Sequence, residues 1–175
     1  MKPDAVRIWD LPTRLFHWAL LAAVAGLFLT AYGPDTWIEW HPRMGYAVLT
    51  LLLFRLVWGV VGGHWSRFAT FVPGPRRVLA YLRGDPQAAA PPGHSPLGAL
   101  AVLAMLAALL AQVATGLVSD DEIAFTGPLN RFVSNATGLA ATVWHKGWGQ
   151  WLIIGLVLLH IAAIGYYAHV RRNNL

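Results

Sequence analysis

Four stretches of the chain are apolar over a length that suits a membrane span. They run over about 15–32, 44–61, 97–118 and 148–170. Because an α-helix rises about 1.5 Å per residue, about 20 apolar residues cross the roughly 30 Å hydrocarbon layer of a bilayer. In lipid every backbone polar group needs an internal partner, which a helix supplies. The pattern therefore predicts an all-α membrane protein, a four-transmembrane-helix bundle that forms a single domain over residues 1–175.

Two polar segments connect these spans and are long enough to hold structure of their own. The segment 62–93 is rich in proline and arginine, and residues 76–83 within it are expected to form a short surface helix. The segment 119–143 contains a Thr-Gly-Pro turn signal. After that turn, residues 129–141 are expected to form a second short helix along the membrane surface.

The basic residues are distributed unequally between the two sides that the four spans define. Nine lie on the side of the termini and of segment 62–93: Lys2, Arg7, Arg14, Arg67, Arg76, Arg77, Arg83, Arg171 and Arg172. The other side carries Arg43, Arg131 and Lys146 and most of the acidic residues. Because loops rich in Lys and Arg stay in the cytoplasm, both termini and loop 62–93 are predicted to be cytoplasmic, and loop 119–143 periplasmic.

Composition narrows the functional classes further. The chain is 57% hydrophobic and only 12% charged, unlike a soluble domain, and it has no cysteine. Without cysteine there are no disulfides, iron–sulfur clusters, thiolate zinc sites or covalently attached c-type haem. The net charge is +5, and the basic residues that carry it flank the apolar spans. This placement indicates membrane topology and not nucleic-acid binding. The first apolar stretch has no evident small-residue cleavage site, so no cleaved signal peptide is expected.

Four histidines fall at two depths of the predicted bundle. His145 and His160 are fifteen residues apart on one apolar segment, which on a single helix places them within about 60° of one face and roughly 22 Å apart. With the orientation above, His41 and His145 lie near the outer face, and His17 and His160 lie towards the inner face. An ionisable residue in a membrane span is a candidate functional residue. The sequence therefore predicts two bis-histidine sites, His41 with His145 and His17 with His160.

Haem b suits such sites better than zinc or copper. Two imidazoles complete six-coordinate haem iron, whereas tetrahedral zinc needs two further ligands at each level. Gly45, Gly149 and Gly165 follow ligand candidates by four or five residues and would let a flat macrocycle approach the backbone. The alternative is that these glycines serve helix packing. For His41 and His145, the alternative is that they anchor helix ends at the interface.

The three remaining histidines are weaker ligand candidates. His64 follows the second span and His94 precedes the third, both at the cytoplasmic edge, where they would suit proton delivery. His169 lies nine residues after His160, about 180° around a helix, and so points away from the predicted ligand face.

Several motifs of the chain resemble the bacterial cytochrome b561 family, and within it the b-type cytochrome subunits related to that of nickel–iron hydrogenase. The likeness is carried by residues 6–18 (VRIWDLPTRLFHW), 41–46 (HPRMGY), 54–59 (FRLVWG), 68–75, 93–98, 115–117 and 159–163. These stretches are distributed over nearly the whole length of the chain. The resemblance implies a four-helix protein of the bacterial inner membrane that holds two b haems and passes electrons between a partner and membrane quinone.

The family's ligand histidines carry over onto His17, His41, His145 and His160, the same four that depth selects. Two departures from the family pattern concern the outer site. The last two ligands are fifteen residues apart where fourteen is usual, and Lys146 follows His145 where the family more often has Glu.

Basic side chains near the two levels are candidate partners for haem propionates. Arg55 lies within the second span at the inner depth, where a propionate would be a bidentate partner. Arg14 would serve the same group from the cytoplasmic edge, as would Arg67. Arg43 and Lys146 are the outer candidates. Contact with lipid headgroups is the alternative for Arg14, Arg67 and Lys146.

These features predict a di-haem cytochrome that moves electrons between a periplasmic partner, such as a c-type cytochrome, and quinone. The acidic run 120–122 would guide a basic partner, or is an ordinary solvated loop. One alternative is a superoxide:quinone oxidoreductase, in which Arg43, Arg131 and Lys146 draw the anion to the outer haem. Others are a haem-bearing anchor subunit of a hydrogenase or molybdenum enzyme, and a haem-free membrane protein. Membrane lipid is the expected surrounding, and a homodimer stays open.

Overall fold

The computed structural model describes residues 9–85, 88 and 95–169, and the regular structure there is helical apart from one isolated antiparallel bridge. Four helical segments are long and apolar enough to cross a membrane. They are α1 (Leu11–Tyr32), α2 (Trp40–Val61), α5 (Pro96–Val118) and the run Asn135–His169, which comprises α6 (Asn135–Lys146) and α7 (Trp148–His169). The predicted all-α class with four membrane-spanning segments is confirmed.

The chain forms two compact units, residues 1–100 and residues 101–175, and the division falls inside α5. That the whole chain forms a single membrane domain stays a prediction.

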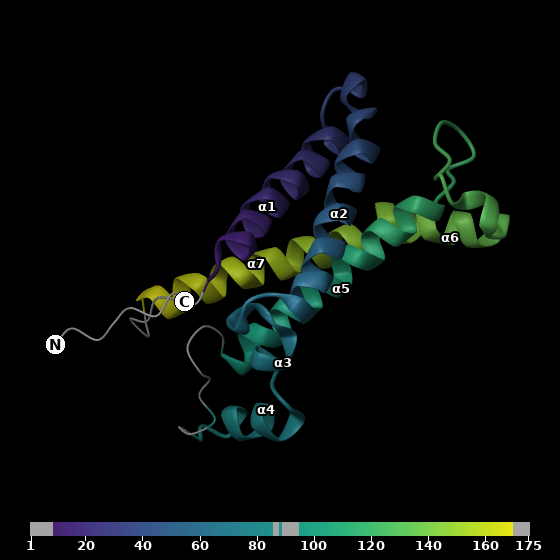
Figure 1. Cartoon of the computed structure of the whole chain (residues 1–175). Coiled ribbons are helices and arrows are strands. Elements are labelled where there is room, and N and C mark those ends of the chain that lie inside the picture. Colours follow the sequence, from purple (N-terminus) through teal and green to yellow (C-terminus); the bar gives the residue numbers. More distant parts are fainter. Residues whose placement is uncertain (1–8, 86–87, 89–94, 170–175) are drawn as a thin grey trace. The chain divides into compact units, whose positions relative to one another are not determined.

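In the first unit, α1 and α2 lie side by side as an antiparallel hairpin (Figure 1). A short connection that contains the 3₁₀ turn Asp35–Trp37 reverses the chain between them. Val48 and Leu52 of α2 are almost fully buried, and Phe16 of α1 is buried as well. The hairpin therefore has a narrow apolar core along one face of each helix.

Both helices of the hairpin begin four residues before the predicted spans. α1 starts at Leu11 because the Asp10 side chain accepts a hydrogen bond of 2.8 Å from Thr13 N and because proline occupies the first turn. α2 starts at Trp40, so its first turns hold the polar residues that precede the apolar run. Each helix is thus longer than its apolar stretch, and His41 is a helical residue.

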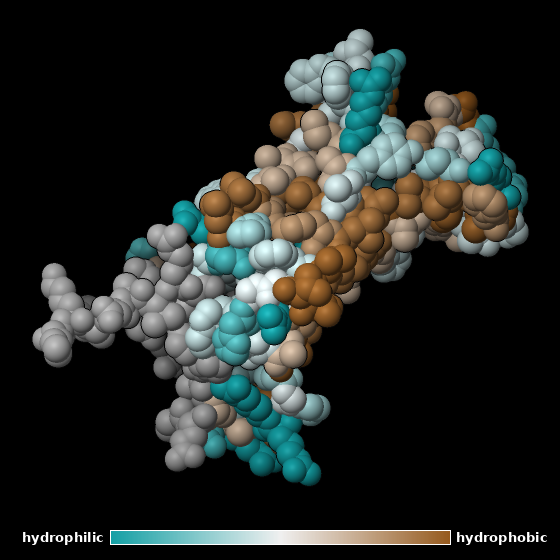
Figure 2. Space-filling model, viewed as in Figure 1, coloured by the Kyte–Doolittle hydropathy of each residue, from teal (hydrophilic) through white to brown (hydrophobic). Residues whose placement is uncertain are grey.

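The outer surfaces of these helices are apolar. Leu15, Leu21 and Leu29 of α1 and Val57 and Val60 of α2 are each at least half exposed. Figure 2 shows such side chains in brown along the long helices. A soluble protein rarely exposes so large an apolar surface, whereas a membrane protein presents it to lipid.

After α2 the chain forms short helices that belong to the polar segment. These are the 3₁₀ turn His64–Ser66, α3 (Phe68–Phe71) and α4 (Pro75–Leu82). The predicted surface helix at 76–83 is α4, displaced by one residue. Hydrophilic side chains gather at α4, in teal at the foot of Figure 2.

In the second unit, the last part of α5 leads through an ordered loop to α6 and α7. The short helix predicted at 129–141 forms instead as the 3₁₀ turn Asn130–Phe132 followed by α6. The later start has a local cause, since the Ser134 side chain accepts a hydrogen bond of 3.2 Å from Thr137 N and caps α6.

A break at Gly147 separates α6 from α7. Gly147 has φ −111° and ψ −106°, outside the helical region, and an added Cβ would lie 2.6 Å from Val143 O. His145 therefore belongs to α6 and His160 to α7. The prediction that the two lie on one continuous helix is wrong, and the angle counted between them along such a helix does not apply.

Candidate functional site

The His41 ring, in the first turn of α2, reaches back to α1. Its Nδ1 lies 3.1 Å from Leu27 O and 3.4 Å from Thr30 Oγ1. A carbonyl oxygen can only accept, so this hydrogen bond assigns the ring proton to Nδ1 and the lone pair to Nε2. A neutral imidazole held in this way has the form in which histidine binds a metal through Nε2.

His145 has the same kind of surroundings in the second unit. Its Nδ1 lies 2.8 Å from Gln112 O and 3.4 Å from Thr115 Oγ1, both on α5. The Gln112 side-chain amide donates to His145 O at 2.8 Å, so two hydrogen bonds join α5 to the end of α6. The close approach requires glycine at Gly116, where an added Cβ would lie 2.9 Å from His145 Cε1.

The first unit places His17 and His41 at two separate levels. Leu27, which contacts His41, is ten residues after His17 on α1, and therefore about 15 Å further along the helix axis. The two side chains cannot share one metal ion.

The second unit repeats this separation. Gly149 of α7 packs against Gln112, whose carbonyl group bonds to His145, so Gly149 marks the level of His145. His160 is eleven residues after Gly149 on the uninterrupted helix α7, about 16 Å further and within about 20° of the same face. Each unit thus carries one ligand candidate at each of two levels with a similar spacing.

The two candidates for the inner site, His17 and His160, differ in exposure. The remaining histidines that the structure describes have surroundings unlike those of His41 and His145. His17 is exposed on α1, with its ring edge against Trp18, and His160 is partly buried on α7. His64 is exposed and contacts Trp65. His169 Nδ1 bonds to Gly165 O of its own helix, at 3.0 Å. His94 lies outside the described residues.

Arg55 is buried in the last part of α2, with only 5% of its surface exposed. Its Nη1 donates to Ser66 O at 3.1 Å, and its guanidinium lies 4.7 Å from the centre of the Phe68 ring. The segment after α2 folds back over the helix and covers this cation. Ser66 and Phe68 are thus partners of Arg55 that the sequence analysis did not identify. A propionate contact of Arg55 stays a prediction.

Asp10 lies next to this group and joins three parts of the first unit. Its Oδ2 accepts hydrogen bonds from Ser66 Oγ at 2.8 Å and from Trp58 Nε1 at 3.0 Å, while Oδ1 caps α1 through Thr13 N. Partial burial raises the pKa of Asp10, but the hydrogen bonds from Thr13, Ser66 and Trp58 outweigh it and hold the pKa below its ordinary value. The carboxylate is therefore ionised in the fold, close to the Arg55 cation.

Arg67, Arg43, Lys146 and Arg14 are the other propionate candidates, and Arg67 Nε donates to Gly62 O at 2.8 Å. The Arg43 guanidinium lies 4.6 Å from the centre of the Trp40 ring, and Lys146 Nζ forms an ion pair of 3.0 Å with Asp121. Arg14 is exposed in the first turns of α1. Contacts of Arg14, Arg43 and Lys146 with a propionate stay predictions.

Of the three glycines predicted to make room for a macrocycle, two face open space. An added Cβ at Gly45 or at Gly165 would meet no atom within 4 Å. At Gly149 it would instead overlap the Gln112 side chain, so this glycine is needed for packing within the second unit. The helix surface near His41 can therefore accept a flat group, and within either unit the described residues hold no cluster of three metal-ligating carboxylates or imidazoles.

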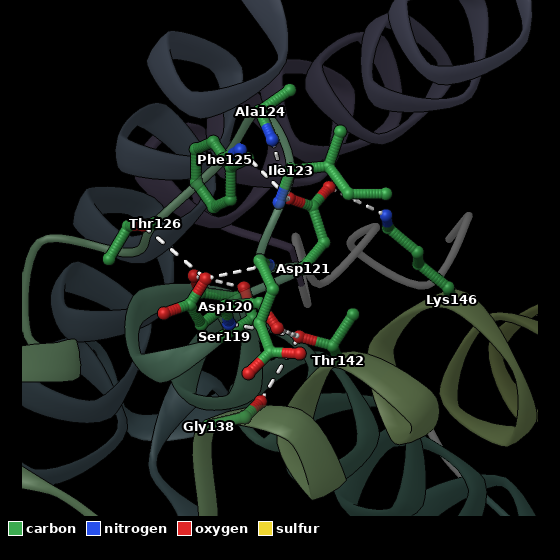
Figure 3. A network of polar contacts seen from close by, with 12 residues as sticks. Ser119, Asp120, Asp121, Ile123, Ala124, Phe125, Thr126, Gly138, Thr142 and Lys146 are labelled. Atoms are coloured by element: carbon green, nitrogen blue, oxygen red, sulfur yellow. Dashed lines mark hydrogen bonds and ion pairs between the residues drawn. The ribbon is translucent and has the colours of Figure 1, made fainter. Parts of the chain in front are cut away.

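The acidic residues of the 119–134 loop bond to other residues of the loop and to α6, and Figure 3 shows the bonds of Asp120 and Asp121. Asp121 Oδ1 accepts hydrogen bonds from the backbone N–H groups of Ile123, Ala124 and Phe125, and Oδ2 pairs with Lys146. The N–H groups of Ala124 and Phe125, then the Lys146 ammonium and the N–H of Ile123, lower the pKa of Asp121 far below its ordinary value. This carboxylate therefore orders the loop.

Four membrane-spanning helical segments and imidazoles at two levels of each unit define the class of protein: a helical membrane protein that carries imidazoles of the kind that bind haem iron. The model of one family, prokaryotic cytochrome b561, matches residues 8–175. The chain belongs to that family.

Curated relatives of low identity agree with this assignment. The probable Ni/Fe-hydrogenase 1 B-type cytochrome subunit of Escherichia coli K12 is 23% identical over 188 residues, covering 88% of this chain and 80% of the relative. The probable Ni/Fe-hydrogenase B-type cytochrome subunit of Azotobacter vinelandii is 26% identical over 196 residues, with 91% and 80% covered. That of Bradyrhizobium diazoefficiens is 23% identical over 205 residues, with 96% and 79% covered. No solved structure matches the chain significantly.

Family membership makes this protein a haem b electron-transfer protein that crosses the bacterial inner membrane several times. The residues present fit the cofactor. In His41 and His145 the Nδ1 proton is directed to a carbonyl group, so Nε2 would be the atom that binds iron, and Gly45 leaves room beside His41.

Proposed function

We propose that the protein binds two haems b and connects a redox partner on the periplasmic side with quinone in the membrane. His41 and His145 would hold the outer haem, and His17 and His160 the inner one. The observation that carries the proposal is the repeated spacing: each unit has one imidazole at each of two levels, separated by about 15 Å in one unit and about 16 Å in the other.

The spacing fits two cofactors because it excludes shared ligation and yet keeps the two levels close. Bound at these levels, two haems would supply one-electron transfer across the membrane. The protein residues would hold the imidazoles in one tautomer, shield the sites from water with apolar helices, and offer cations to the acidic groups of the cofactor. Arg55 and Arg14 are the inner cations, and Arg43 and Lys146 the outer ones.

The surface of the loop between α5 and α6 supports the proposal of a periplasmic partner that docks through apolar contacts. Its acidic side chains are used to order the loop, whereas Ile123 at its tip is 93% exposed and Phe132 is 69% exposed. Such a surface favours a protein subunit over a basic c-type cytochrome guided by charge alone. Because the relatives are named as hydrogenase cytochrome subunits, a redox enzyme subunit is the partner we propose.

The superoxide:quinone alternative depends on cations at the outer level. Arg43 lies over the Trp40 ring, Arg131 lies over the Phe132 ring, and Lys146 pairs with Asp121. Reduction of the purified protein by superoxide at a rate close to diffusion would support this alternative, and so would the absence of a co-purifying redox subunit.

Haem content in histidine variants tests the proposal directly. The purified protein should contain two haems b per chain by the pyridine haemochrome assay. His41→Ala and His145→Ala should each lose one haem, and the same one, as identified by its midpoint potential. His17→Ala and His160→Ala should each lose the other haem.

Two histidines serve as matched controls, because His64 and His169 are exposed and lie outside both levels. His64→Ala and His169→Ala should keep both haems. One haem per chain in the unmodified protein, or full haem content in His17→Ala, would contradict the di-haem assignment. If a quinol analogue reduces both haems, this result would support quinone as the membrane substrate.

A further inference from the structure

The same group of atoms surrounds both outer ligand candidates. In the first unit, His41 Nδ1 faces Leu27 O, and Thr30 stands three residues after that carbonyl group. In the second unit, His145 Nδ1 faces Gln112 O, and Thr115 again stands three residues after it. The distance from Nδ1 to the threonine Oγ1 is 3.4 Å in both units.

The hydroxyl groups have a defined direction. Thr30 Oγ1 lies 2.8 Å from Gly26 O and 3.1 Å from Leu27 O, so its single proton points to carbonyl groups of its own helix. Thr115 Oγ1 lies 2.9 Å from both Ala111 O and Gln112 O. With its proton used in this way, each hydroxyl turns its lone pairs to the imidazole and acts as a second acceptor for the Nδ1 proton.

Hydrogen bonds of this kind on their own are common in apolar helices and indicate no site. Thr50 of α2 makes one too, to Tyr46 O at 2.9 Å, on the exposed side of the helix. What distinguishes Thr30 and Thr115 is that each also meets a histidine from the next helix, and that the arrangement occurs once in each unit.

We propose that Thr30 and Thr115 are positioning residues for the outer haem: each one fixes the Nδ1 proton of its histidine and so sets the electron donation of Nε2 to the iron. The proposal rests on the proposed function, because it takes His41 and His145 as ligands. An acceptor at the Nδ1 proton makes an imidazole a stronger donor, which favours the oxidised metal. The two hydroxyls should therefore lower the midpoint potential of the outer haem.

Isosteric variants with both haems bound test this role. Thr30→Val and Thr115→Val remove the hydroxyl and keep the shape. Each should raise the potential of one haem and leave the other unchanged in a redox titration. The double variant should favour the reduced outer haem about tenfold, which is about 59 mV for a one-electron couple. The low-field electron paramagnetic resonance signal of that haem should shift as well.

Three comparisons make the result specific. Thr30→Ser and Thr115→Ser keep the hydroxyl and should restore the potential, and Thr50→Val removes a hydroxyl that has no histidine and should change neither haem. Should a valine variant fail to load haem, Thr30→Ala and Thr115→Ala give the same test. Unchanged potentials, a lowered outer potential, or an equal effect of Thr50→Val would overturn the proposal.

The outcome can be separated from that of the proposed function. If His41→Ala and His145→Ala each lose a haem while the threonine variants leave both potentials unchanged, only the role of the threonines fails. If His41→Ala and His145→Ala keep both haems, the ligand assignment fails and the role of the threonines fails with it.

Discussion

At the scale of single residues, Asp10 makes the stability of the first unit depend on pH. Its pKa is lower in the fold than the ordinary value of about 3.9, so the ionised form is favoured by folding. The stabilisation is fully present above pH about 3.9 and is lost as the pH falls through the lower pKa of the folded state. In detergent, the wild-type protein should therefore lose thermal stability as the pH falls below 4.

Asp10→Asn isolates this effect. The variant keeps an oxygen that can cap α1 through Thr13 N, but it places an amide N–H₂ opposite the donors of Trp58 and Ser66. We expect a loss of about 1–3 kcal/mol at neutral pH, because donors are left without an acceptor, and a weaker dependence on pH. Thermal unfolding of the variant and of the wild type at pH 7 and at about pH 3 measures both. A variant as stable as the wild type would contradict the role of the carboxylate.

The sequence identifies the candidate ligands but not what holds them. His17, His41, His145 and His160 follow from depth and from the family motifs. The carbonyl groups of Leu27 and Gln112 do not, because every residue has one and only the packed helices bring these two to an imidazole. A threonine within an apolar helix is the one sequence feature that could have marked these positions, and Thr50 shows that this feature is not specific.

At the scale of elements, hydropathy locates the spans and misjudges their ends. α1 and α2 each begin four residues early because Asp10, Pro12 and the polar first turns are good helix starts but poor lipid neighbours. The break at Gly147 escaped prediction because a glycine within an apolar run is also common in continuous membrane helices. Gly147 is the one non-helical residue between His145 and His160, whose spacing is one residue longer than usual in the family.

The loop between α5 and α6 offers a test at the same scale. Asp121 accepts three backbone hydrogen bonds, whereas its ion pair with Lys146 is exposed and contributes little. Asp121→Ala should therefore abolish the protection of the amides of Ile123, Ala124 and Phe125 in hydrogen exchange. Lys146→Met should leave most of that protection. Equal loss in the two variants would mean that the ion pair, and not the backbone cap, orders the loop.

At the scale of the whole molecule, the four spans and the family can be predicted from the sequence. The spans follow from the length of the apolar stretches, and the family follows from short motifs spread along the chain. The pairing of histidines between the two units, which we propose above, is of another kind. It depends on how helices far apart in the sequence meet, and no local pattern encodes that. The orientation in the membrane is predicted by the unequal distribution of basic residues, and labelling can measure it.

The orientation can be measured with single cysteines, because the chain has none of its own. Ile123→Cys places a thiol at the exposed tip of the loop after α5, and Arg83→Cys places one at the exposed end of α4. Because the sequence predicts nine basic residues on the side of α4, that side should face the cytoplasm. A membrane-impermeant maleimide should then label Ile123→Cys in intact spheroplasts, and Arg83→Cys only after the membrane is opened. The reverse pattern would invert the topology, and with it the assignment of the His41 level to the periplasmic partner and of the His17 level to the cytoplasmic side.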